Sequence, residues 1–166
     1  PVVLGFIASP QATSIPETKA GIAHGGDDPK LFAPYYPGAA ASLKELQDKA
    51  QGAGSLNWIP EHDQIIRRMP MVVRVGDTLY PSFAADMLRL AQGASTYVVK
   101  SSGASGEKAF GEKTGIVKIR VGDFEVPTEA NGQMWIRFTP ESKDRYLPAW
   151  KVLNGEIGAD AIAGRI

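Results

Sequence analysis

The side chains that could perform chemistry are few, and they are not grouped in a catalytic pattern. The chain has two histidines, His24 and His62, and no cysteine, which excludes thiol nucleophiles, disulfides and thiolate metal sites. The segments 61–63 (Glu-His-Asp) and 27–28 (Asp-Asp) offer metal donors, but the ligands of one ion are seldom consecutive residues. No G-x-S-x-G sequence occurs. We therefore predict no catalytic residue, no metal site and no cofactor, and we interpret both segments as exposed turns.

The segment 106–114 (GEKAFGEKT) is similar to a phosphate-binding loop. That motif requires G-x4-G-K-[ST], because the spacing fixes both the cradle of backbone amides and the reach of the lysine. Here Glu112 stands between Gly111 and Lys113, and strand-like residues follow where the motif needs a helix. We interpret this segment as a solvated surface loop and expect no nucleotide there.

Arg67 has an unusual place in the pattern, because it falls on the apolar face of a predicted strand. A buried guanidinium needs a partner, which could be Asp63, Asp86 or a carbonyl group. Alternatively, Arg67 or Arg68 holds a small anionic ligand through paired hydrogen bonds, or a bulge turns Arg67 outward. Arg67, Arg68, Asp63 and Asn57 are the candidate ligand-binding residues.

The composition limits the classes of function. The 166 residues include 18 basic and 18 acidic side chains, which gives a net charge of zero, and the charges are interspersed. A protein that neutralises phosphates would have a basic patch or stripe, so we expect no nucleic-acid partner. The longest apolar run, residues 2–8, is too short to span a bilayer. We expect a single domain over residues 1–166, a fragment of a longer protein that continues at both ends.

The elements that would position these residues follow from hydrophobic periodicity. It predicts a mixed α/β (α+β) fold, with hairpins in a twisted mixed sheet and helices packed against it. Strand patterns occupy residues 2–8, 54–59, 65–75, 96–99, 116–121, 124–126 and 134–138. Helical patterns occupy residues 42–52, 81–91 and 148–153, with a further helical turn at 159–163. Residues 164–166 are expected to begin another strand.

Several details of this assignment can be checked. Five prolines in 9–41 predict a long connection without a helix or central strand. The strands at 54–59 and 65–75 should form a hairpin around the turn at 60–63, with an edge or a bulge at Pro70. The strands at 116–121, 124–126 and 134–138 should form a meander, with a second hairpin turn at Asn131-Gly132.

The helix ends are predicted from capping rules. Ser42 should cap the first helix together with Glu45, and Gly52 should end it. Pro81 suits the first turn of the second helix. The apolar stripe of that helix is expected to consist of Phe83, Ala84, Met87, Leu88 and Ala91.

One short sequence occurs twice. Residues 73–77 (VRVGD) are repeated at 119–123 (IRVGD), and in both copies Gly-Asp should form a two-residue hairpin turn. A helix is expected after the first copy and a hairpin after the second. We interpret the copies as two similar turns and not as a domain repeat.

The run from Gly52 to Arg89, GAGSLNWIPEHDQIIRRMPM followed by LYPSFAADMLR, resembles the type-2 CHASE domain. That family has a strand with glycine and asparagine, an aspartate turn, an arginine with a proline shortly after, and a proline-serine helix. Asn131–Ile136 and Gly164–Ile166 match its later motifs. The chain departs from the family at Asp63-Gln64, where aspartate-glycine is usual.

The resemblance implies an extracytoplasmic sensory domain of a membrane-anchored bacterial signalling protein, of the class III cyclase or histidine kinase type. It implies an unidentified small ligand or stimulus, no enzymatic activity in this chain, membrane helices flanking it in the parent protein, and a homodimer as an open option. The alternatives are a small soluble enzyme and a binding module with an anionic small-molecule site.

Overall fold

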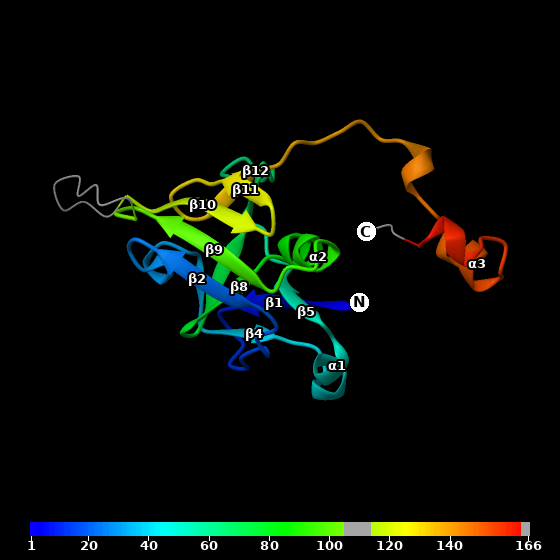
Figure 1. Cartoon of the computed structure of the whole chain (residues 1–166), viewed down its shortest axis with the longest axis horizontal. Helices are drawn as coiled ribbons and strands as arrows, with labels where there is room; N and C mark the ends of the chain where they lie inside the picture. Colours follow the sequence, from blue (N-terminus) through cyan, green and yellow to red (C-terminus); the bar gives the residue numbers. More distant parts are fainter. Residues whose placement is uncertain (105–113, 164–166) are drawn as a thin grey trace. The chain divides into compact units, whose positions relative to one another are not determined.

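The computed structural model of the chain describes residues 1–104 and 114–163. The chain divides into an N-terminal unit, Pro1–Ile136, and a C-terminal unit, Arg137–Ile166. Within the described residues, all strands belong to the N-terminal unit (Figure 1). The C-terminal unit contains α3 (Ala149–Leu153) and two 3-10 helices, Lys143–Arg145 and Ala159–Ala161. The predictions for residues 105–113 and 164–166 fall outside the described residues.

The described strands of the N-terminal unit form four small sheets. The first has β1 (Val3–Ser9) between β4 (Gly38–Ala40) and β5 (Gly52–Ser55). The second has the order β11 (Phe124–Pro127), β10 (Ile116–Val121), β9 (Thr96–Ser101) and β2 (Gly21–Gly25). The third joins β3 (Tyr35–Tyr36), β7 (Val72–Val75) and β8 (Thr78–Pro81). The fourth pairs β12 (Gln133–Trp135) with β6 (Arg68–Pro70).

Helix α2 (Phe83–Ala91) joins the first two sheets, because it contacts β5 and β1 of the first and β10 of the second (Figure 1). The core has two clusters of buried side chains. Val72 belongs to the cluster beside β9 and β10, and Val73 to the cluster beside Phe6 and Tyr80, whose rings meet edge to face at 5.3 Å. Strand β7 is therefore buried on both faces, which explains its continuous apolar sequence. The mixed α/β class is confirmed.

The strand predicted over 65–75 is interrupted. β6 ends at Pro70 and pairs with β12, while β7 begins at Val72 and pairs with β3 and β8. Between them, the Met71 amide donates to the carbonyl of Gly132 (2.9 Å). The chain thus changes partners at Met71. A regular alternation of buried and exposed side chains does not hold there, since Val72 and Val73 are both fully buried.

Two predicted hairpins are also wrong. β5 ends at Ser55 and runs parallel to β1, and it does not pair with β6. β11 pairs with β10 alone, and β12 pairs with β6, so the meander stops after β11. In both cases a distant strand replaces the neighbour in sequence. The turns at Gly76-Asp77 and Gly122-Asp123 are confirmed, and both glycines have positive φ (57° and 56°).

The segment 9–41 contains β2, β3, β4 and the 3-10 helix Pro29–Leu31. Each of these strands lies at the edge of its sheet, so the exclusion of a central strand is confirmed, and the absence of helix holds except for that single turn. Edge strands tolerate nearby prolines because one side needs no ladder hydrogen bonds.

The helix ends differ from the predictions. α1 (Lys44–Lys49) begins after Leu43 without a side-chain cap, so the capping box of Ser42 and Glu45 is wrong. Ser42 instead accepts a hydrogen bond at its carbonyl from Gln47 Nε2 (2.6 Å). α2 is capped by Ser82, whose Oγ accepts from the Ala85 amide (3.3 Å), and Pro81 is the last residue of β8.

The predicted apolar stripe of α2 is not its buried face. The buried side chains of this helix are those of Ala85, Asp86 and Arg89. The stripe residue Ala84 is exposed, and Met87 and Leu88 are half-buried. The buried face therefore carries the Asp86–Arg89 ion pair, at positions outside the predicted stripe.

Candidate functional site

The predicted arginines lie in a cluster of opposite charges. Arg67 Nη2 is 2.8 Å from Asp63 Oδ2, and Arg67 Nη1 donates to Glu61 Oε2 at 3.1 Å. Arg68 Nε donates to the other oxygen of Glu61 at 3.2 Å. The Arg68 guanidinium also lies over the Trp135 ring, 5.2 Å from its centroid. β6 brings Arg68 and Trp135 together, because these two residues are partners in the β6–β12 ladder.

The turn before β6 orients Asp63. Its Oδ1 accepts from the Ile65 amide (3.1 Å), and Gln64 has φ 64°, a left-handed conformation that favours glycine. Position 64 is where the type-2 CHASE family, which the sequence resembles, usually has glycine. The hydrogen bond from Arg67, followed by that from the Ile65 amide, lowers the pKa of Asp63 below its ordinary value. Asp63 is therefore a stable anion beside Arg67.

Of the partners expected for Arg67, Asp63 is confirmed and Asp86 is wrong. Arg67 precedes β6, and its side chain is 37% exposed, so it does not lie on a buried strand face. Both terminal nitrogens of its guanidinium already contact carboxylates of Glu61 and Asp63. Binding of a ligand by Asp63, Arg67 and Arg68 remains a prediction.

Asn57 is engaged elsewhere in the fold. Its Oδ1 accepts from the Ala8 amide (2.7 Å), and its Nδ2 donates to the Ala8 carbonyl (2.8 Å). Ser55 Oγ also donates to Asn57 Oδ1 (2.8 Å). These bonds fasten β1 to the chain that leaves β5. The side chain of Asn57 therefore stabilises the contact between these two segments. A ligand-binding role for Asn57 stays a prediction.

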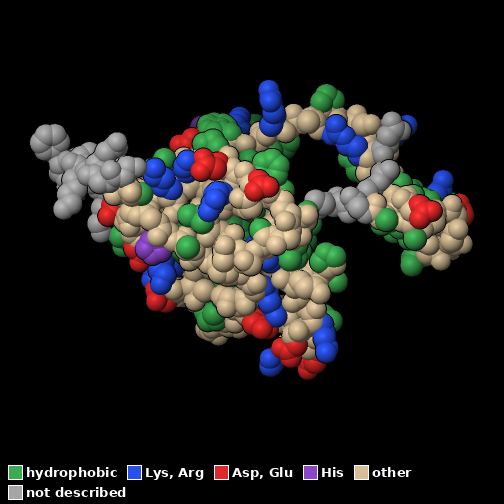
Figure 2. Space-filling model, viewed as in Figure 1, with side chains coloured by type: hydrophobic (Ala, Val, Ile, Leu, Met, Phe, Trp, Pro, Cys, Tyr) green, Lys and Arg blue, Asp and Glu red, His purple; other side chains and the backbone are tan. Residues whose placement is uncertain are grey.

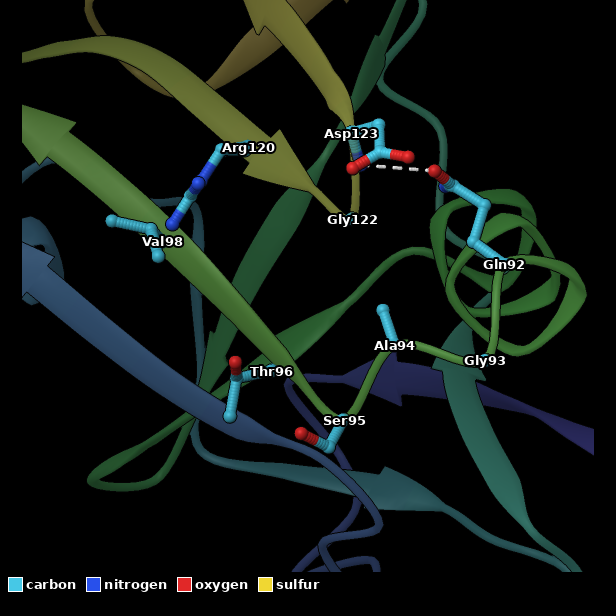
Figure 3. A pocket seen from close by; sticks show the side chains of 9 residues that line it. All are labelled: Gln92, Gly93, Ala94, Ser95, Thr96, Val98, Arg120, Gly122 and Asp123. Carbon is cyan, nitrogen blue, oxygen red and sulfur yellow. Dashed lines mark hydrogen bonds between the residues drawn. The ribbon is translucent and has the colours of Figure 1, made fainter.

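The structure contains a pocket that the sequence did not predict. It has a volume of about 360 Å³. It is lined by residues 92–96 after α2, by Val98 of β9, and by Arg120, Gly122 and Asp123 of the β10–β11 hairpin (Figure 3). This volume lies in the range of small-molecule sites, about 300–1,000 Å³.

A buried network fixes one wall of this pocket. Arg89 Nε donates to Asp86 Oδ1 (2.7 Å), and the Tyr97 hydroxyl donates to the same oxygen (2.7 Å). Arg89 Nη1 donates to the carbonyl of Ala94 (2.9 Å), and Nη2 to the carbonyl of Gln51 (3.1 Å). The chain after α2 is thereby held against β9 and the start of β5.

Gln92 fixes the opposite wall. Its Oε1 accepts from the Asp123 amide (3.0 Å), and its Nε2 donates to the carbonyl of Val121 (3.1 Å). A Cβ atom on Gly122 would lie 2.5 Å from Gln92 Oε1, so glycine allows this close approach. The β10–β11 turn is therefore docked onto the end of α2.

The charged groups of the pocket differ from those of the Arg67 cluster. Arg120 faces Glu125 in the β10–β11 ladder, but Glu125 Oε2 accepts from Lys118 Nζ (2.6 Å). Lys118 lowers the pKa of Glu125 by this hydrogen bond and by its charge, with smaller contributions from Arg120 and Lys100. In the described part of the chain, neither Arg120 nor Asp123 has a side-chain hydrogen bond or ion pair. In Figure 2, basic and acidic side chains lie interspersed over the region of β9 and β10.

Among the described residues, no three His, Cys, Asp or Glu side chains lie close enough together to hold a metal ion. None of the helices in these ranges is long and apolar enough to cross a bilayer.

The N-terminal unit is thus a mixed α/β domain with a pocket at the end of α2. The chain belongs to the CHASE2 family, since the model of the CHASE2 domain matches residues 6–166. CHASE2 domains are extracellular sensory domains of signalling proteins, and they are not catalytic. Comparison with curated proteins and with solved structures gives no match.

Proposed function

We propose that the chain is the extracytoplasmic sensory domain of a membrane-anchored bacterial signalling protein, of the class III cyclase or histidine kinase type. The observation that carries this proposal is the match to the CHASE2 model over nearly the whole chain. The neutral, interspersed charges agree with a domain whose partner is not a nucleic acid.

The domain responds to a small ligand or stimulus by shifting the equilibrium between two arrangements of the parent protein. A ligand can do this only if its affinity for the two arrangements differs. In this proposal the parent protein passes the change to the membrane through helices that flank the chain, and a homodimer of the domain would let the two copies move relative to each other.

The test uses intact cells that make the full-length protein. Candidate small molecules are added to the medium, and cyclic nucleotide levels and phosphorylation of the protein are measured. We expect at least one compound to change one of these outputs, and a full-length variant with a destabilised domain, Arg89→Met, to lose the response. Outputs that are the same in both proteins under every condition would contradict the proposal.

The Arg67 site is tested separately on the 166-residue chain. Thermal unfolding is followed with a series of small anions in the wild type and in Arg67→Ala. If the Arg67 cluster binds an anion, its stabilising effect is lost in the variant. Identical responses of both proteins would remove the cluster as a ligand site.

A further inference from the structure

The two copies of the R-V-G-D sequence form turns of the same kind with different surroundings. In the first, Arg74 Nη2 donates to Asp77 Oδ1 (3.3 Å), and Arg74 Nε donates to the carbonyl of Gly76 (2.9 Å). The Arg74 guanidinium also lies 5.1 Å from the centroid of the Tyr35 ring. The arginine and the aspartate of this copy are thus bonded to each other and to neighbouring groups of the same protein.

In the second copy, the corresponding side chains, Arg120 and Asp123, do not pair within the described structure. Both are exposed, and both line the pocket at the end of α2. Figure 3 shows the guanidinium of Arg120 beside Val98 and the carboxylate of Asp123 near Gln92, on separate sides of the space. The pocket therefore presents one positive and one negative group.

The backbone that carries each group is held in place. The Asp123 amide donates to Gln92, and Arg120 belongs to β10, which pairs with a strand on either side. The hydroxyl groups of Ser95 and Thr96 line the same pocket and can donate or accept hydrogen bonds. Polar groups converging on a preformed pocket are the usual means of orienting a small ligand.

We propose that this pocket binds a small zwitterion of the amino-acid class, with its carboxylate on Arg120 and its ammonium group on Asp123. A simple anion would face the carboxylate of Asp123, and a simple cation would face the guanidinium of Arg120. A molecule that carries both charges satisfies both groups, and charge-assisted hydrogen bonds favour it. The inference rests on the proposed sensory function and names its ligand class.

The experiment measures binding by isothermal titration calorimetry with the 166-residue chain. The probes are the standard amino acids, each tested alone. Propionate, which is only negative, and ethylamine, which is only positive, are the comparison compounds. We expect at least one amino acid to bind and both single-charge compounds to bind more weakly. Arg120→Gln and Asp123→Asn should each weaken amino-acid binding about tenfold or more.

Arg74→Gln and Asp77→Asn are matched controls, since they change the same residue types in the other copy of the turn. They should leave the affinity unchanged. Arg120→Lys should retain part of the binding, because it keeps the charge and loses the paired hydrogen bonds. Circular dichroism confirms that each variant is folded.

Three results would overturn the inference: no binding of any amino acid, unchanged affinity in Asp123→Asn, or propionate binding as tightly as the amino acid. None of these results would contradict the sensory function, which is tested separately by the cell-based experiment. Conversely, an amino acid that binds the pocket without altering either output would contradict the sensory function and not the pocket.

Discussion

Arg89 forms a buried ion pair, and it was not among the candidate residues named from the sequence. Its side chain is 4% exposed, and that of its partner Asp86 is completely buried. Four hydrogen bonds from its guanidinium reach Asp86, Ala94 and Gln51. A buried ion pair is costly to break on one side, because the remaining charge stays unpaired.

Arg89→Met should destabilise the fold by about 3–5 kcal/mol, since it leaves Asp86 buried without its countercharge. The free energy of unfolding is measured in urea. Arg120→Met is the matched control, and this exposed position should change stability by less than about 0.5 kcal/mol. Equal effects of the two substitutions would contradict the structural role of Arg89.

Tyr97 makes stability depend on pH in the alkaline range. Burial, followed by its hydrogen bond to Asp86, raises the pKa of Tyr97 far above the ordinary 10.0. Below about pH 10 the phenol is protonated in both the folded and the unfolded chain. Above it the unfolded chain loses a proton that the folded chain retains, so stability falls as pH rises.

Tyr97→Phe should therefore show a shallower loss of stability between about pH 10 and 11 than the wild type. It should keep part of the slope, because burial also raises the pKa of Tyr80. Urea unfolding at several pH values provides the measurement. Tyr146→Phe, at a side chain that is 65% exposed, is the control and should leave the slope as it is.

At the scale of elements, α2 packs closely against β5. A Cβ atom on Gly54 would lie 2.5 Å from Phe83 Cα and 2.6 Å from Phe83 N. These are backbone atoms at the start of the helix, so they cannot move aside as a side chain would. The helix packs directly on the strand because position 54 is glycine.

Gly54→Ala should cost about 1–3 kcal/mol of stability through overpacking. Gly25→Ala is the control in the same unit, because its Cβ would meet only Ala104 Cβ, at an ordinary 3.8 Å. Thermal or urea unfolding compares the two. A Gly54→Ala protein as stable as Gly25→Ala would refute the close packing of α2 on β5.

The features that could be predicted from the sequence are those set by neighbouring residues. The Gly-Asp turns, the position of α2 and the strands β1, β9, β10 and β11 follow from turn residues and periodicity. Pairing between distant segments is set by tertiary packing and is invisible to such rules. For this reason the switch of partners at Met71 and the pairing of β12 with β6 were missed.

The same limit applies to the site. The pairing of Arg67 with Asp63 is local, and Asp63 was among the alternative partners expected from the sequence. The pocket combines the end of α2 with the β10–β11 turn, and Gln92 links them across 31 positions of sequence. The repeat of R-V-G-D is visible in the sequence, but only the structure shows that its arginine and aspartate pair in the first turn and not in the second.

At the scale of the whole molecule, membership in the CHASE2 family assigns a sensory role to the chain. The central claim of the proposed function is that this domain faces the outside of the cytoplasmic membrane. Its lack of cysteine makes the claim directly testable, because a single introduced thiol reports on one position.

The measurement labels the full-length protein in intact cells with a membrane-impermeant maleimide. Lys49→Cys places a thiol at an exposed site on α1, and Val99→Cys places one at a fully buried site as a control. Relative to the unsubstituted protein, we expect Lys49→Cys to be labelled in intact cells, and Val99→Cys to be labelled only after denaturation. Labelling of Lys49→Cys that requires cell lysis would place the domain inside the cell and contradict the account.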